Sequence, residues 1–368
     1  MPEFRERVLS FAFDMCGCPN RCRHCWLGKA SNSPLDAGEI VERFLKLREH
    51  VESGAEQPHL ERVRCFASYF REPHYSDGYR DMRDRELELN GGIDFSAGYE
   101  LLSVWRLARD PAYAPWARMI GVRKCQIALF GMADTNDWFC RRVGAHADIL
   151  SATLRLLENG IQPRWQVFVT KKGLRELPDL LDLVDFLHLR ERSTAMGGRF
   201  ELFLNDATPI GEARRLEGLR VDGEDVASIP GELIRSTEDY TGKPFRWATE
   251  AEWISEVLSK PDRPVGLDYP KDLWFNVDSL WDVYPNVGSL EPWWRLGNLR
   301  RDSPASLFGR FLHDGAPALR GARDLSMHEA ARRYGDPRGG RMFGSETDLQ
   351  QLWLERWCES QVSPGQLS

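Results

Sequence analysis

The sequence lacks long apolar segments and clusters of positive charge. No segment of the 368 residues approaches the length of a membrane span, and residues 1–7 contain no apolar stretch of signal-peptide length. The formal net charge is -7, and no run rich in Lys and Arg is present. Binding to nucleic acid or to an anionic membrane surface is therefore not favoured. We expect a soluble cytoplasmic protein with no nucleic-acid partner and no membrane partner.

Several common catalytic patterns are also missing. We find no Ser/His/Asp set, no phosphate-binding glycine loop and no pair of carboxylates, and the Gly91-Gly92 and Gly197-Gly198 pairs are typical of turns. Hydrophobic residues make up 42% of the chain and charged residues 29%, which predicts a folded protein with a sizeable core.

The eight cysteines do not form the pattern of a disulfide framework. Four of them lie between positions 16 and 25, and the others are scattered at Cys65, Cys125, Cys140 and Cys358. Buried single thiols together with one metal site are typical of a reducing compartment.

The most informative segment is the cysteine cluster near the N-terminus. Cys18, Cys22 and Cys25 have the spacing C-x3-C-x2-C and follow Val8–Phe13, an apolar run that predicts a buried strand. Three thiolates on one loop can hold three irons of a 4Fe–4S cluster and leave the fourth iron open to a small molecule. The alternative is a structural zinc site that also uses Cys16. Zinc sites normally use two separated pairs, and four ligands within ten residues would strain a tetrahedral cage, so we favour the cluster.

Strand-like and helix-like segments alternate through the first half of the chain. Strands are predicted at 8–13, 63–69, 99–105, 126–130, 165–169 and 186–189, and helical periodicity is found at 40–51, 149–157 and 177–184. This order predicts βαβ units with a parallel sheet, and therefore an α/β fold with a partial parallel (β/α)6 barrel. Active sites in such folds gather at the C-terminal ends of the strands, where the cysteine segment is expected to lie.

The pattern changes after position 205. We predict that residues 1–205 form the barrel, that residues 206–250 form a linker or insertion, and that residues 251–368 form a smaller α+β extension.

Four segments of the first half are together similar to the radical S-adenosylmethionine (SAM) superfamily. They are the cysteine segment, Ser68–Pro73 where that superfamily often has Gly-Gly-Glu-Pro, Gln126–His146, and Glu158–Leu180, and they occur in the expected order. The segment 273–299 is similar to the SPASM or twitch extension of some of these enzymes. Asn286 stands where such extensions usually have a cysteine, so no auxiliary cluster is expected.

The resemblance implies roles for individual residues. It implies that Cys18, Cys22 and Cys25 hold one 4Fe–4S cluster and that SAM chelates the open iron. Acceptors for the methionyl amine would come from Ser68 and Glu72, and a donor for the carboxylate from Arg141 or Arg142, of which only one is expected to point inward. Further candidates for the adenine site are His24, Gln166 and Thr170. For each of these, the alternative is a solvated or packing residue.

Candidates for contact with substrate follow the second and sixth predicted strands. They are His74, His188 and Glu191. A lone histidine on an apolar strand is more often a core residue, which is the alternative for His188.

The resemblance implies a radical SAM enzyme in which a 5′-deoxyadenosyl radical abstracts hydrogen from a small metabolite of a biosynthetic pathway. A flavodoxin or ferredoxin would supply the electron. Two alternatives remain open: modification of a peptide or protein side chain, and a non-catalytic regulatory protein that binds an Fe–S cluster or zinc.

Overall fold

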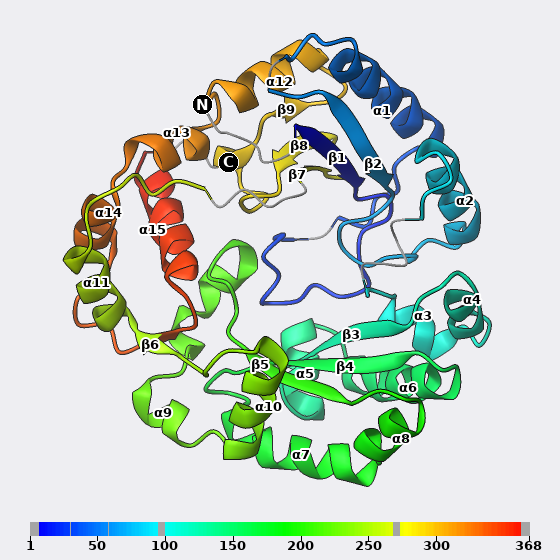
Figure 1. Cartoon of the computed structure of the whole chain (residues 1–368), viewed down its shortest axis with the longest axis vertical. Helices are drawn as coiled ribbons and strands as arrows, with labels where there is room; N and C mark the ends of the chain where they lie inside the picture. Colours follow the sequence, from blue (N-terminus) through cyan, green and yellow to red (C-terminus); the bar gives the residue numbers. More distant parts are fainter. Residues whose placement is uncertain (1–6, 30, 58, 95–99, 268–272, 362–368) are drawn as a thin grey trace.

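The computed structural model describes residues 7–29, 31–57, 59–94, 100–267 and 273–361, and shows a mixed α/β fold (Figure 1). The elements form a ring in which one group of strands faces another. Strands β1, β2 and β7–β9 lie in the upper part of the view, β3–β5 lie in the lower part, and α11 and α13–α15 complete the left side. The α/β class predicted from the sequence is thereby confirmed.

The first sheet combines strands from both ends of the chain. Its order is β2 (Arg62–Ala67), β1 (Val8–Phe13), β7 (Leu273–Val277), β8 (Asp282–Pro285) and β9 (Gly297–Asn298). β1 pairs in parallel with both β2 and β7, whereas β7–β8 and β8–β9 are antiparallel. All six residues of β1 are buried because the strand has a neighbour on each side. The C-terminal part of the chain therefore completes the sheet on which the cysteine segment depends.

The second sheet is parallel and has the order β3 (Lys124–Leu129), β4 (Gln162–Phe168) and β5 (Glu201–Asn205). Helices α5 (Ala133–Cys140) and α6 (Ala145–Glu158) connect β3 to β4, and α7 (Leu177–Phe186) and α8 (Leu189–Ala195) connect β4 to β5. Each crossover contains helix, as the sequence pattern predicted for parallel strands.

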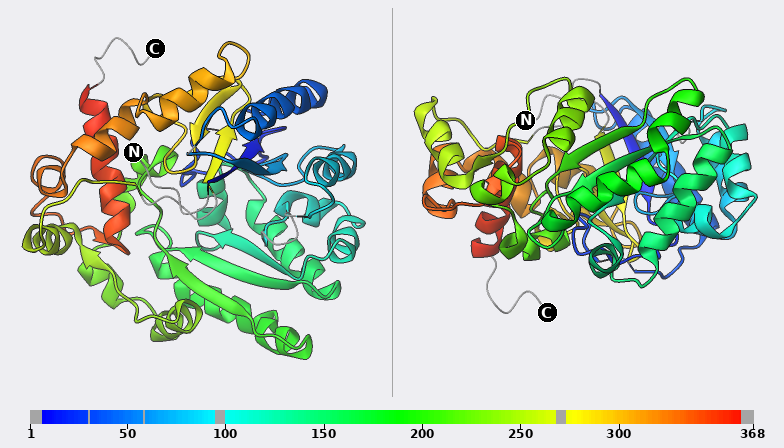
Figure 2. Two further views of the ribbon diagram at one scale, coloured as in Figure 1. Left: turned by 45° about the horizontal axis from the view of Figure 1, so that its top comes forward. Right: turned by 90° about the horizontal axis from the view of Figure 1, so that it is seen from below.

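The remaining elements cover these two sheets, form a small antiparallel sheet of β6 and β10, and close the ring. They are α1 (Ala37–Glu52), α2 (Tyr79–Leu89), α3 (Val104–Arg109), α4 (Tyr113–Met119), the 3-10 segments η2 (Leu174–Glu176), η3 (Gly211–Leu219) and η4 (Pro292–Trp294), α9 (Gly223–Ala227), α10 (Gly231–Thr241), β6 (Ala248–Thr249), α11 (Glu250–Ser259), α12 (Pro304–Leu312), α13 (Pro317–Asp324), α14 (Met327–Tyr334), β10 (Met342–Phe343) and α15 (Glu346–Gln361). Helix α15 lies beside the short C-terminal helices and away from β3–β5 (Figure 2).

Two predicted strands are wrong. Tyr99 lies outside the described residues, and the chain from Val104 onward is helix α3, which begins where the Ser103 side chain accepts the backbone N–H of Arg106. Residues 186–189 join α7 to α8, with His188 in the left-handed region at φ 51°. Of these residues only Leu189 is buried, whereas Phe186 is exposed, so the run is a helix junction that periodicity over four residues does not separate from a strand.

The third strand of the second sheet is β5, at 201–205, where no strand was predicted. Beyond it, residues 206–250 contain η3, α9 and α10. Helix α10 packs on β5, where the Leu204 amide donates to Thr237 Oγ1 at 3.0 Å. The division of the chain at 205 and 250 stays a prediction.

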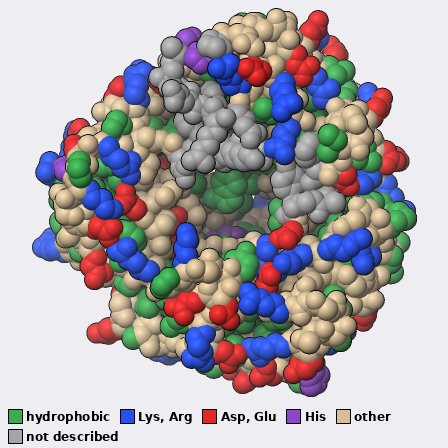
Figure 3. All heavy atoms as spheres, viewed as in Figure 1, with side chains coloured by type: hydrophobic (Ala, Val, Ile, Leu, Met, Phe, Trp, Pro, Cys, Tyr) green, Lys and Arg blue, Asp and Glu red, His purple; other side chains and the backbone are tan. Residues whose placement is uncertain are grey.

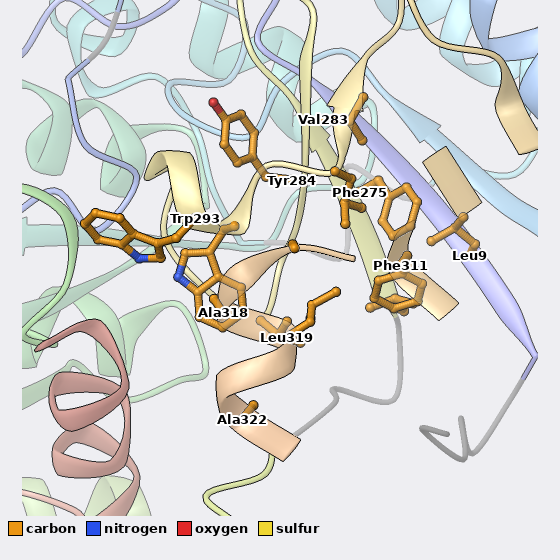
Figure 4. Close-up of a cluster of buried hydrophobic side chains, with 14 of the residues drawn as sticks. Leu9, Phe275, Val283, Tyr284, Trp293, Phe311, Ala318, Leu319 and Ala322 are labelled. Carbon is orange, nitrogen blue, oxygen red and sulfur yellow. The ribbon is translucent and has the colours of Figure 1, made fainter. Parts of the chain in front are cut away.

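A large apolar core lies between the first sheet and the C-terminal helices. Leu9 of β1 and Phe275 of β7 pack with Phe311 of α12, and Leu319 of α13 lies in the same cluster (Figure 4). A second core covers β3–β5 and includes Trp165, whose Nε1 donates to Thr153 Oγ1 at 3.1 Å. These cores hold the two strand groups rigidly on either side of the space between them.

No helix among the described residues combines the length and apolar character needed to cross a membrane.

Candidate active site

The three cysteines of the C-x3-C-x2-C spacing open into one cavity of about 530 Å³, here called the cysteine cavity. They lie on the cysteine loop (residues 14–29), which follows β1. Across the cavity are Gln126 of β3 and Gln166 of β4, so both strand groups contribute to its wall. The face in Figure 3 is hollowed at its centre, with hydrophobic side chains on the floor of the hollow.

The cysteine loop rests against the C-terminal end of α5. The amides of Arg21 and Arg23 donate to the carbonyls of Cys140 and Phe139 at 3.2 Å and 2.8 Å. These carbonyls belong to the last turn of the helix and have no partner within it, so the loop satisfies them. The helix thereby fixes the segment that carries Cys22.

A second anchor comes from the start of η3, far along the sequence. The Glu212 amide donates to the Cys25 carbonyl at 3.0 Å. Gly211 has φ +58°, and a Cβ there would lie 2.7 Å from the Cys25 carbonyl oxygen and closer still to that of Trp26. Only glycine allows this approach of two backbones without a collision.

The cysteines of the loop are half-buried. Burial raises the pKa of Cys18 and of Cys25, and the charge of Arg71 opposes the rise at Cys25. A hydrogen bond with the Cys140 thiol, together with burial, raises the pKa of Cys22. Because a thiol must lose its proton to bind iron or zinc, metal binding at this loop would release protons.

The donor set of the cysteine loop suits iron–sulfur ligation by its chemistry, since Cys18, Cys22 and Cys25 line one cavity and thiolates are the ligands that hold such clusters. Within the part of the chain that the structure describes, no group of three His, Cys, Asp or Glu side chains could hold one metal ion. Cys16 lines a second cavity of about 540 Å³ instead.

Glu72 lies where the two cavities meet and lines both. Its Oε1 accepts the Ser103 hydroxyl at 2.7 Å, and burial raises the pKa of its carboxyl group. Ser68 lines only the second cavity, and its amide donates to Glu86. The structure therefore brings Glu72, but not Ser68, to the cysteines.

The two adjacent arginines differ in direction. Arg142 lines the cysteine cavity, where its Nε donates to Asn20 Oδ1 at 2.6 Å and its Nη1 pairs with Asp148 at 2.5 Å. Arg141 does not line this cavity, and its Nη2 pairs with Glu212 at 2.9 Å. Of the two, only Arg142 lines the cysteine cavity, and a role of either arginine in binding SAM stays a prediction.

Gln126 joins the site although no role was predicted for it. Its Nε2 donates to Gln166 Oε1 at 2.8 Å, and its Oε1 accepts from Arg164 Nη2 at 2.7 Å. The sequence signal that could have identified Gln126 is its place on a strand in which partly exposed residues alternate with buried ones. Thr170 lies outside this cavity, where its hydroxyl accepts the Gly173 amide at 3.3 Å.

His24 lies deep in the cysteine cavity between two aromatic rings. Its ring centroid is 4.3 Å from that of Phe130 and 4.7 Å from that of Phe168. Burial lowers the pKa of His24 to about 3, so the imidazole is neutral at physiological pH. Its Nδ1 has no hydrogen-bond partner among the described residues, which leaves a polar atom beside the cysteines that a bound group could satisfy.

The structure does not bring the predicted substrate residues to this cavity. His188 and Glu191 are exposed at the junction of α7 and α8, because the strand on which their placement depended is absent there. His74 is buried at the second cavity, with its Nδ1 2.6 Å from the Tyr113 hydroxyl. Burial lowers the pKa of His74 to about 3.

Comparison with known proteins gives a match at the level of the fold. No family model matches the sequence, and no curated protein matches it. The structure is similar to native anSMEcpe with bound AdoMet (S-adenosylmethionine), with a TM-score of 0.51, 13% sequence identity, and coverage of 96% of this chain and 97% of that chain. The structure of native anSMEcpe with AdoMet and the Cp18Cys peptide gives the same TM-score, identity and coverage. The chain therefore shares, over nearly its whole length, the fold of a protein whose structure contains bound S-adenosylmethionine.

Proposed function

We propose that this protein is a radical SAM enzyme whose cysteine cavity holds one 4Fe–4S cluster and one SAM. The observation that carries the proposal is the meeting of three thiols with Glu72, Arg142 and two glutamine amides in one cavity. Thiolates suit iron–sulfur clusters, and the other groups suit the charges and polar edges of SAM. The shared fold with an AdoMet-bound structure supports the same assignment.

When bound, the cluster would deliver an electron that cleaves SAM, and the resulting 5′-deoxyadenosyl radical would abstract a substrate hydrogen. Glu72 would accept hydrogen bonds from the methionyl ammonium, and Arg142 would donate to the carboxylate. Gln126 and Gln166 would bind polar edges of the nucleoside. His24 and Phe130 would exclude water from the same region, since Phe130 is buried and the His24 ring packs against it.

The fold suits this role as a partial (β/α)6 barrel. The two groups of three parallel strands would form its wall, and one of these strands, β7, comes from the part of the chain after residue 250. The rest of that part would form a SPASM-like extension without auxiliary clusters. The proposed substrate is a small metabolite, because the cysteine cavity must accommodate substrate next to SAM and has a volume of about 530 Å³. A flavodoxin or ferredoxin would supply the electron.

A second candidate is the modification of a peptide side chain. One observation favours it: a structure of the same fold contains the Cp18Cys peptide in addition to AdoMet. The hollow in Figure 3 is the place where a peptide would enter. Incubation of the reduced enzyme with metabolite and peptide libraries, with 5′-deoxyadenosine as the readout, would separate the two substrates.

The test of the function is anaerobic reconstitution with iron and sulfide. We expect a brown protein with about four irons per chain, which forms 5′-deoxyadenosine from SAM after reduction. Cys22→Ser should lose SAM cleavage. Cys358→Ala is the matched control, because Cys358 is a buried cysteine of α15 that does not line the cysteine cavity.

Zinc in the protein as isolated, with no SAM cleavage after reconstitution, would favour the non-catalytic alternative. Full SAM cleavage by Cys22→Ser would show that the ligand assignment is wrong.

A further inference from the structure

The Arg71 side chain is buried between the cysteine loop and the ends of β1 and β2, with only 5% of it exposed. Its Nη2 donates to the carbonyls of Leu27 and Lys29 at 2.9 Å and 3.3 Å. Its Nη1 donates to the Gly28 carbonyl at 3.1 Å and lies 3.7 Å from Cys25 Sγ. One guanidinium group thus holds three successive carbonyls and one of the three thiols.

Asp14 extends this arrangement to the start of the loop. Its Oδ2 accepts from Arg71 Nε at 2.8 Å, and its Oδ1 accepts the Gly17 amide at 3.1 Å. The Asp14 side chain is 4% exposed, so the two charges form a buried pair. Asp14 holds the beginning of the loop and Arg71 holds its end, so the pair links both ends to the edge of the first sheet.

Arg71 and Asp14 together are here called the clamp of the cysteine loop. Its geometry requires arginine at position 71. The planar guanidinium group presents five N–H donors in a fixed fork, whereas a lysine ammonium is a single point from which the same acceptors are not reached together. The contact with Cys25 Sγ has a second consequence. A positive charge and an N–H donor beside a ligand sulfur stabilise the more negative, reduced state of an iron–sulfur cluster.

We propose that Arg71 is a positioning residue that clamps the cysteine loop through Asp14 and raises the reduction potential of the cluster by its charge and its contact with Cys25 Sγ. The inference rests on the proposed function, since it requires a cluster on this loop. Arg71 itself touches no substrate. It acts on the loop, on the ligand sulfur and, through both, on the ease of the first electron transfer.

The experiment compares variants of the full chain after reconstitution and without SAM. The readouts are iron per chain and the midpoint potential from an EPR-monitored redox titration. In Arg71→Gln, we expect the ratio of reduced to oxidised cluster at the parent midpoint to fall about 10-fold, which corresponds to about 59 mV for one electron. In Asp14→Asn, the ratio should rise, because the Arg71 charge loses its counterion.

Two further variants separate charge from shape. Arg71→Lys retains the charge but loses the fork, so its potential should stay nearer to the parent value than that of Arg71→Gln, while its iron content falls. Arg7→Gln is the matched control: Arg7 is an exposed arginine next to β1 that does not line the cysteine cavity, and solvent screens its charge, so both readouts should stay at the parent values.

Shifts of opposite sign in Arg71→Gln and Asp14→Asn support the inference, because a purely structural defect would lower iron content in both without that reversal. If Arg71→Gln does not fold, the rise expected in Asp14→Asn decides the question. Parent potentials and parent iron content in both variants would overturn it. If the unmodified protein binds no cluster, the proposed function is wrong. If the unmodified protein binds a cluster but the variants keep its potential and iron content, only the inference about the clamp is wrong.

Discussion

The two groups of parallel strands contribute different chemistry to the cysteine cavity. After β1 and β2, the functional groups lie on irregular segments: the three cysteines and Glu72. In the second sheet, Gln126 and Gln166 lie on β3 and β4 themselves, where the paired register determines their positions. The first group therefore depends on contacts made by other parts of the chain, and the second depends on the sheet.

This difference predicts where substitutions will be most damaging. A loop without regular backbone pairing must be held by individual contacts, so the loss of one contact can move several ligands. A side chain on a paired strand keeps its place when a neighbour changes. The five predictions that follow test this contrast, from the largest expected effect to the smallest.

Gly211→Ala should have the largest effect. The added Cβ would collide with the backbone of the cysteine loop, and the left-handed φ costs alanine about 1–2 kcal/mol in addition. We expect iron content after reconstitution to fall below about half of the parent value. Gly218→Ala in the same 3-10 segment is the control, since no atom lies within 4 Å of the added Cβ. Equal iron in both variants would mean that η3 does not support the loop.

Glu72→Gln should weaken SAM binding without loss of iron. A hydrogen bond to a charged group is worth about 1.5–3 kcal/mol, so we expect the Kd to rise about 10- to 100-fold. Isothermal titration of SAM into the reconstituted protein measures this change. Glu88→Gln on the exposed face of α2 is the control. An unchanged Kd for Glu72→Gln would remove Glu72 from the SAM site.

Arg142→Lys should raise the Kd for SAM about 10-fold, because lysine cannot make a bidentate contact with a carboxylate. Arg141→Lys is its natural control, because Arg141 pairs with Glu212 and does not line the cavity. The same titration distinguishes the two. A larger rise in the Kd for SAM in Arg141→Lys than in Arg142→Lys would mean that Arg141, not Arg142, binds the carboxylate.

Gln166→Leu tests the strand-borne half of the site. We expect the Kd for SAM to rise about 3- to 10-fold, since one neutral hydrogen bond contributes about 1 kcal/mol. Iron content should stay at the parent value, because the side chain of Gln166 is hydrogen-bonded to Gln126 and, within the described residues, not to the cysteine loop. Loss of iron in this variant would contradict the division between loop and strand.

His188→Ala should have almost no effect. The residue is exposed at a helix junction outside the cavity, and surface substitutions usually change stability by less than about 0.5 kcal/mol. SAM cleavage within about 2-fold of the parent rate is expected. A large loss of SAM cleavage in this variant would make His188 a candidate catalytic residue again.

The part of the site predicted from the sequence is the part encoded locally. The spacing of the three cysteines and the apolar strand before them are adjacent in the chain, so both were recognisable. The strand at 186–189 was misassigned, because a four-residue run with three apolar side chains fits a strand and a helix junction equally well. Partial recognition of β4 succeeded because its alternation extends over seven residues.

The sequence by itself determined that three cysteine thiols, at the spacing C-x3-C-x2-C, follow directly after a buried strand. Only the tertiary structure decided that Arg142 rather than Arg141 lines the cavity, that Gly211 meets the backbone of Cys25, and that β7 lies next to β1. The physical reason is the separation in sequence between the residues that interact. Ligand type and strand periodicity are properties of neighbouring residues, whereas these contacts join segments that only the packing of the two apolar cores brings together.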